Sequence, residues 1–277
     1  MGDMLDPATP ARAAAGVGAV FHLAGRLFVP GAPASDYHRL HVDATIGLIE
    51  AAARNALEYS VLCTTTGVHG PTRPGVPARE DDEGHPSNAY EESKARAEEA
   101  SARAASRVRA PLVIARPGLV YGPGDRHLLG WYRAIQSGLY RVIGSGANKV
   151  HPIYVDDVVR GLLLAARWSG PVRAYHLVGS EAVTVREMSE AIGAAVGRPV
   201  SRMHLPVSVA HAAGVLFEAL PVARTRLPLT RSRVRFMTEN REYEGSRARD
   251  ELGFVPEVNL GDGLARTVAW YRSQNLL

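Results

Sequence analysis

The stretch Asn88-Ala89-Tyr90-Glu91-Glu92-Ser93-Lys94-Ala95-Arg96-Ala97-Glu98 has the pattern of the first turns of a helix, with Ser87 or Asn88 placed to cap it. Residues four apart on a helix share a face and lie about 5 to 6 Å apart. Tyr90 and Lys94 are therefore predicted to lie side by side. An ammonium beside a phenol lowers the pKa of the phenol toward neutrality, which makes tyrosine usable as an acid or base on an alcohol or ketone.

Short apolar runs alternate with helical patterns on both sides of this stretch. Strands are predicted at residues 19–23, 60–64 and 111–116, and helices at 36–55 and 89–106. Strands that alternate with helices are typical of a parallel sheet covered on both faces. The sequence therefore predicts an α/β fold.

The composition is that of a globular protein long enough for one large or two small domains, with 277 residues and 46% hydrophobic content. No run of 18 apolar residues and no signal-peptide core occurs, so we expect a cytoplasmic protein with no membrane partner. The single cysteine, Cys63, excludes an internal disulfide and is interpreted as a buried strand residue.

Basic residues give a net charge of +4 and are densest between Arg224 and Arg235. The segment Arg231-Ser232-Arg233-Val234-Arg235 has no aromatic residue between its charges, whereas nucleic-acid sites interleave the two. We therefore predict a solvated or substrate-adjacent loop and no nucleic-acid partner. No His, Cys, Asp or Glu cluster has metal-ligand spacing, so no metal site is predicted.

Several segments in a fixed order resemble the extended short-chain dehydrogenase/reductase family of epimerases, dehydratases and 3β-hydroxysteroid-type dehydrogenases. Besides Tyr90 and Lys94, they are Gly2 to Asp6, Val20 to Gly25, Cys63 to Gly70, Arg116 to Asp125, Val155 to Val158, and Ser246 to Pro256. The resemblance implies a Rossmann-like doubly wound parallel sheet and a smaller C-terminal substrate cap. The dinucleotide-binding domain would span residues 1–145, with 151–180 returning to the sheet, and the cap would span 181–277.

The resemblance also implies roles for individual residues. Tyr90 would exchange a proton with the substrate, Lys94 would lower the pKa of Tyr90 and bind the nicotinamide ribose, and Thr65 would orient the substrate. The cofactor would be NAD or NADP, between which the sequence does not decide. Its predicted contacts, in addition to Tyr90 and Lys94, are Asp3, Met4, Leu23, Ala24, Gly25, Pro117 and Val120. The predicted substrate contacts are Thr66, His69 and Arg126.

Two histidines depart from the family pattern. His41 stands where relatives usually have an asparagine near the catalytic lysine, which puts a proton relay there in doubt. His69 stands where relatives usually have a tyrosine. Both, and His22 near the cofactor strand, are interpreted more readily as structural histidines than as acids or bases.

The family's Gly-x-x-Gly-x-x-Gly turn, which holds the pyrophosphate at a helix N-terminus, is not found in the sequence. Met1 aligns near the family's third strand, so an N-terminally truncated sheet is expected, with the strand at residues 19–23 as an apolar edge. A start codon assigned too far downstream, a truncated gene and a shortened family member that relies on a partner all remain open. We expect weak NAD(P) binding and a homodimer.

Residues that differ from those of related enzymes reduce the number of reactions that the resemblance allows. Thr66 and Gly67 stand where sugar 4,6-dehydratases carry an Asp-Glu pair, which argues against dehydration. Val150 and His151 stand where nucleotide-sugar enzymes carry Arg-Asp, and a guanidinium suits phosphate oxygens. The resemblance thus favours an oxidoreductase acting on a secondary alcohol or ketone of an apolar small molecule, similar to a 3β-hydroxysteroid dehydrogenase or dihydroflavonol reductase. The alternatives are a nucleotide-sugar 4-epimerase and a non-catalytic remnant.

Overall fold

The computed structural model describes residues 2–29, 31–55, 57–219 and 229–277. Its main sheet is parallel, in the order β1-β2-β3-β8, and within the described residues β1 pairs only with β2. These strands are β1 (Ala19–His22), β2 (Tyr59–Cys63), β3 (Val113–Pro117) and β8 (Arg173–Leu177). The α/β parallel sheet and the position of β1 at an edge are confirmed.

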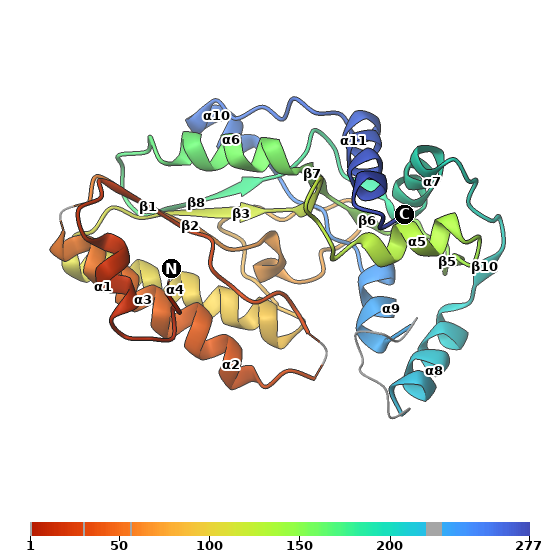
Figure 1. Ribbon diagram of the computed structural model, residues 1–277, viewed down its shortest axis with the longest axis horizontal. Coiled ribbons are helices and arrows are strands. Elements are labelled where there is room, and N and C mark those ends of the chain that lie inside the picture. Colours follow the sequence, from red (N-terminus) through yellow and green to blue (C-terminus); the bar gives the residue numbers. More distant parts are fainter. Residues whose placement is uncertain (1, 30, 56, 220–228) are drawn as a thin grey trace.

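Helices lie on both faces of this sheet (Figure 1). One face carries α1 (Thr9–Ala14), α2 (Ala34–His38), the π-helix η1 (Arg39–Asp43), α3 (Ala44–Arg54) and α4 (Ala89–Val108). The other face carries α6 (Val155–Ala165) and α10 (Ser246–Leu252). Strand interiors are correspondingly apolar, and Val61, Val113 and Leu177 are almost completely buried.

The helix predicted at residues 36–55 is present but is interrupted by η1 near its start. The helix that carries Tyr90 begins as predicted, because the Asn88 side chain accepts a hydrogen bond from the Glu91 amide at 3.0 Å. A short element follows each of two main-sheet strands: the 3₁₀-helix η2 (Thr66–His69) comes after β2, and the short strand β4 (Leu119–Tyr121) comes after β3.

A second core forms beyond the carboxyl ends of the strands, between α5 (Leu129–Gln136), α7 (Val185–Val196) and α11 (Leu260–Ser273). A capping box formed by Thr184 and Glu187 starts α7, and the apolar stripe of this helix is buried in the second core. Paired short strands flank this core: β5 (Val142–Ile143) with β10 (His204–Leu205), β6 (Lys149–Val150) with β9 (Val183–Thr184), and β4 with β7 (Pro152–Tyr154).

Two further helices, α8 (Val207–Glu218) and α9 (Arg231–Thr238), pack on each other below this core (Figure 1). The basic stretch predicted as a loop is therefore helical over Arg231–Thr238, because Thr230 caps it and Val234 is buried. Residues 224–228 of that stretch lie outside the described residues. Two helices pack outside the domain to which the predicted bounds assign them. α5 belongs to 1–145 but packs in the second core, and α10 belongs to 181–277 but packs on β8 of the main sheet. The division at 1–145 and 181–277 stays a prediction.

Among the residues described, no helix combines the length and apolar character that crossing a bilayer requires.

Candidate active site at the carboxyl edge of the sheet

Lys94 lies at the carboxyl ends of β1 and β2, where parallel α/β sheets bind ligands. The residue is buried, with 6% of its surface exposed, and its Nζ donates to the carbonyl oxygen of Cys63 at 3.3 Å. Burial lowers the pKa of Lys94. A Cβ added to Gly25, in the exposed segment after β1, would come within 3.2 Å of the Lys94 Nζ. A side chain at position 25 would therefore crowd this ammonium.

Tyr90 is half-buried in the first turn of α4, and its ring contacts Tyr37 and His41 edge to face, with centroids 6.3 and 5.8 Å away. Burial raises the pKa of Tyr90 above its ordinary value. The expectation that Lys94 lowers this pKa is therefore wrong for this structure. The reason is that the phenol is desolvated between two rings, while the ammonium is directed at the Cys63 carbonyl.

Thr65 follows β2 in an extended conformation, and its hydroxyl oxygen accepts a hydrogen bond from the Gly67 amide at 3.1 Å. This bond caps η2, against which α4 packs. A Cβ on Gly67 would lie 3.3 Å from both Thr65 Oγ1 and Glu91 Oε1, so the residue that follows Tyr90 lies against the Thr65 turn. The structure thus brings Thr65, Tyr90 and Lys94 to one edge of the sheet.

His41 is 1% exposed and lies in η1; π-helical turns occur frequently at functional sites. Its Nε2 accepts from the Arg26 amide at 3.0 Å, and its Nδ1 lies 2.8 Å from Ser93 Oγ. Because Nε2 accepts, the proton of the neutral ring is on Nδ1 and is donated to Ser93, whose hydroxyl donates to the Tyr90 carbonyl oxygen at 2.7 Å. Both ring nitrogens are occupied, so His41 ties the Gly25 segment to α4 as a structural histidine.

Ser93 is the member of this arrangement that the sequence analysis did not identify. The signal for it was its spacing: a hydroxyl three residues after Tyr90 can reach back to the carbonyl of that residue.

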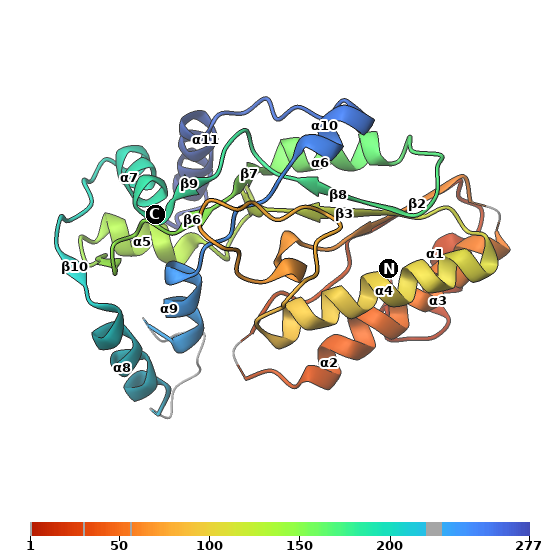
Figure 2. The ribbon, with the colours of Figure 1, turned by 180° about the vertical axis from the view of Figure 1, so that it is seen from behind.

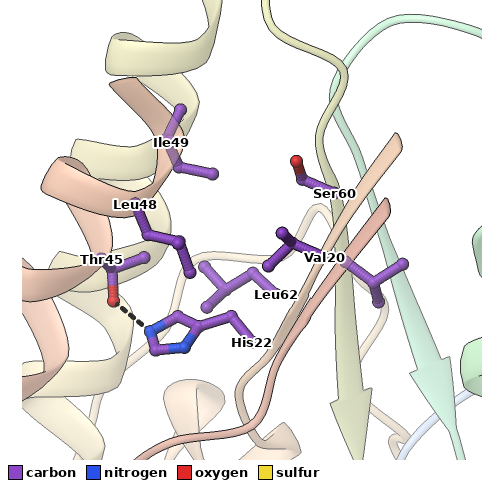
Figure 3. A pocket seen from close by; sticks show the side chains of 8 residues that line it. Val20, His22, Thr45, Leu48, Ile49, Ser60 and Leu62 are labelled. Carbon is purple, nitrogen blue, oxygen red and sulfur yellow. Dashed lines mark hydrogen bonds between the residues drawn. The ribbon is translucent and has the colours of Figure 1, made fainter. Parts of the chain in front are cut away.

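His22 is also structural. Its Nε2 donates to Thr45 Oγ1 at 2.9 Å, since that hydroxyl donates in turn to the His41 carbonyl oxygen. Figure 3 shows His22 and Thr45 among the side chains that line a gap between β1, β2 and α3. The volume of this gap is about 10 Å³. This gap has room for about one water molecule and is not a substrate site.

The predicted substrate residues have different surroundings. Thr66 is buried, and its hydroxyl donates to the Pro117 carbonyl oxygen at 3.3 Å. His69 is buried with its Nε2 2.9 Å from Nε2 of His176, in a cluster with Tyr243. Arg126 is exposed in the turn between β4 and α5. Their contact with a substrate stays a prediction.

Several of the predicted cofactor residues lie at or just beyond the carboxyl ends of main-sheet strands. Leu23, Ala24 and Gly25 are exposed directly after β1, Pro117 ends β3, and Val120 is half-buried in β4. Asp3 and Met4 form the turn before α1, where the Asp3 side chain accepts from the Leu5 amide at 2.9 Å. Contact of these residues with the cofactor stays a prediction. No group of three or more metal-ligating side chains occurs in the described ranges.

Comparison with known proteins decides the family. The sequence model of the NAD dependent epimerase/dehydratase family matches residues 1–177. The chain belongs to this family. The cofactor of the family is NAD, and its named members are reductases, dehydrogenases, dehydratases and epimerases; the chain is an oxidoreductase-type enzyme of this group.

Among its relatives is a 2-alkyl-3-oxoalkanoate reductase of Stenotrophomonas maltophilia, 32% identical over 97% of this chain and 84% of the relative. A 3β-hydroxysteroid-dehydrogenase/decarboxylase of Arabidopsis thaliana is 26% identical over 96% of this chain, which spans only 50% of that protein. A dTDP-glucose 4,6-dehydratase from Streptomyces venezuelae, solved with NAD bound, superposes with a TM-score of 0.77 at 25% identity, over 100% of this chain and 81% of that one.

Proposed function

We propose that this enzyme interconverts a secondary alcohol and the matching ketone on a fairly apolar small molecule, with NAD as the hydride carrier. The observation that carries the proposal is the buried Lys94 ammonium, which lies against the exposed Gly25 segment and one helical turn from Tyr90. A buried ammonium beside a tyrosine at the carboxyl edge of the sheet is the arrangement that alcohol–ketone chemistry needs.

Tyr90, Lys94 and Thr65 each have a role in the proposed reaction. NAD supplies the hydride acceptor or donor when it is bound. Tyr90 is a neutral phenol at pH 7, since the ordinary pKa of tyrosine is about 10 and burial raises it further, so it can donate a proton to a ketone oxygen as the hydride arrives at the carbon. Lys94 would bind the nicotinamide ribose, and the Thr65 hydroxyl would orient the substrate oxygen. A protonated Tyr90 favours the reduction direction.

The substrate class is inferred from the position where nucleotide-sugar enzymes carry Arg-Asp. Val150 is 1% exposed and packs in the second core, while His151 lies 3.1 Å from the Gly179 carbonyl oxygen and stacks on Tyr243. Neither side chain is a cation that could pair with a phosphate. The names of the first relatives, a reductase of alkyl oxoalkanoates and a hydroxysteroid dehydrogenase, support an apolar ketone or alcohol.

The alternative is nucleotide-sugar 4-epimerisation. It is supported by a UDP-glucose 4-epimerase of Mycolicibacterium smegmatis, which is 27% identical over 92% of this chain. The absence of a guanidinium at Val150 and His151 ranks this second.

A substrate screen tests the proposal. We expect reduction of apolar ketones, including 3-oxosteroids and 2-alkyl-3-oxoalkanoates, with NADH oxidation as the readout, and no interconversion of UDP-sugars. Tyr90→Phe should abolish turnover and leave cofactor binding nearly intact, because only the proton donor is removed. Tyr132→Phe, which removes a buried hydroxyl from the second core, is the matched control and should retain activity. UDP-galactose to UDP-glucose exchange without ketone reduction would reverse the ranking.

A further inference from the structure

A short extended segment, residues 239–244, links the cap side of the molecule to the loop that precedes α4. We call it the strap. The Asn240 carbonyl oxygen accepts from the Thr72 amide at 2.7 Å, and its side chain accepts from the Lys149 amide at 2.8 Å. Ala78 and Tyr243 form a parallel bridge. Figure 2 shows the chain between α9 and α10 passing beside the loop before α4. The strap is thereby hydrogen-bonded on both sides.

One side chain of the strap reaches the first turn of α4. Arg241 donates from Nη1 to Glu91 Oε1 at 2.7 Å, and from Nη2 to Ser87 Oγ at 3.2 Å and Glu239 Oε2 at 3.0 Å. The Arg241 and Glu91 side chains are 13% and 7% exposed. A buried ion pair is poorly screened by solvent, and removing one partner leaves the other charge buried and unpaired.

Glu91 is the residue next to Tyr90, and it is fixed on several sides. Its Oε2 accepts from the Ser87 amide and hydroxyl at 2.8 and 2.9 Å, and a Cβ on Gly67 would lie 3.1 Å from its Cγ. Any movement of Glu91 therefore moves the start of α4 against the turn that carries Thr65.

We propose that Arg241 is a positioning residue: through Glu91 it fixes the first turn of α4, and so the Tyr90 hydroxyl, and it neutralises the carboxylate of the residue that follows Tyr90. This inference rests on the proposed function, in which Tyr90 transfers the proton. The inference extends that function, because proton transfer by Tyr90 then depends on the contact of Glu91 with Arg241, which lies about 150 residues further along the chain.

The ion pair between Arg241 and Glu91 affects the pKa of Tyr90 in a defined direction. The charge of Glu91 raises the pKa of Tyr90, after the larger effect of burial. The other groups around Tyr90 are Cys63, Tyr37 and His41, and Lys94 lies one turn further along α4. Without Arg241 the Glu91 charge is uncompensated, so the pKa of Tyr90 rises further. Without the Glu91 charge it falls.

Four variants of the 277-residue chain test this: Arg241→Met, Arg241→Lys, Glu91→Gln and the double variant Arg241→Met/Glu91→Gln. Arg160→Met is the matched control, because Arg160 pairs with buried Asp157 on α6, which covers the opposite face of the sheet. For alcohol oxidation, Arg241→Met should shift the pH profile upward by about half a unit or more, and Glu91→Gln should shift it downward. Arg241→Lys and the double variant should stay near the parent, and Arg160→Met should change only stability.

The second readout needs no turnover. The chain is labelled with fluorotyrosine, and the Tyr90 resonance is identified by its loss in Tyr90→Phe. Its titration should move up in Arg241→Met and down in Glu91→Gln. A folded Arg241→Met variant with the parent's pH profile and the parent's fluorine titration would overturn the inference. A parent without turnover would contradict the proposed function instead, and the fluorine titration would still decide the role of Arg241.

Discussion

At the scale of one residue, Lys94 is a charged side chain that the fold buries at the candidate active site, although burying a charge is unfavourable. An ammonium that is 6% exposed, with a backbone carbonyl as its described acceptor, is costly to desolvate, and burial lowers its pKa accordingly. Such shifted groups concentrate at functional sites. The neighbouring histidines avoid a second buried charge by staying neutral, since burial and Lys94 lower the pKa of both His22 and His41 to about 4.

The neutral histidines predict a loss of stability in acid. The pKa of His69 is also lowered to about 4, mainly by burial, whereas unfolded histidines titrate near 6.5. The unfolded chain therefore binds more protons between these values, so the free energy of unfolding falls as the pH drops from about 6.5 to 4 and is unaffected by these groups above that window. Each histidine contributes up to about 1.4 kcal/mol per pH unit.

Urea unfolding at pH 7.5, 6, 5 and 4.5 measures this. His41→Gln can still accept from the Arg26 amide, and it should give a shallower dependence on pH. His127→Gln, which changes an exposed residue, should follow the parent. An unchanged slope in His41→Gln would mean that His41 takes up its proton over the same pH range in the folded and the unfolded chain.

At the scale of elements, sequence patterns predicted the strands and long helices correctly. They did not predict the direction in which the pKa of Tyr90 is shifted. The strand and helix around Cys63 and Tyr90 follow from apolar periodicity and from the Asn88 cap, both of which are local signals. The upward pKa of Tyr90 depends on the burial of its ring, which contacts Tyr37 of α2 and His41 of η1, and such contacts between separate elements are not local signals. The contact of Arg241 with Glu91 could not be predicted, because nothing in either local sequence specifies a partner so far away.

The capping box of α7 gives a prediction for an element. Thr184 Oγ1 accepts from the Glu187 amide at 3.0 Å, and Glu187 Oε2 accepts from the Thr184 amide at 2.7 Å. Thr184→Ala removes the first bond and should lower the free energy of unfolding by about 1 kcal/mol. Thr184→Ser retains the hydroxyl and should stay within a few tenths of the parent. Equal losses in both variants would assign the effect to the methyl group instead of the cap.

At the scale of the whole molecule, the exposed edge of β1 and the segment after it lie together. β1 has no second strand neighbour in the part of the chain that the structure describes, and Leu23 beside it is 55% exposed. An open edge with apolar neighbours is a site for association. We therefore predict that the chain forms a homodimer, which light scattering of the purified protein measures, and that Phe21→Lys on β1 reduces the dimer fraction. A monomeric parent would contradict this.

A further prediction for the whole molecule concerns its affinity for the dinucleotide cofactor. The 277-residue sequence holds no Gly-x-x-Gly-x-x-Gly turn, so the backbone amides and helix N-terminus that hold a pyrophosphate are not supplied by such a turn. Charge-assisted hydrogen bonds of this kind contribute roughly 1.5 to 3 kcal/mol each, and lacking two or three weakens binding by several factors of ten. Calorimetric titration of this chain with NAD and NADP should therefore show weak binding, weakened further in Lys94→Met, since the nicotinamide end is then lost as well. Micromolar affinity that survives Lys94→Met would mean that the dinucleotide is held by residues other than those at Gly25 and Lys94.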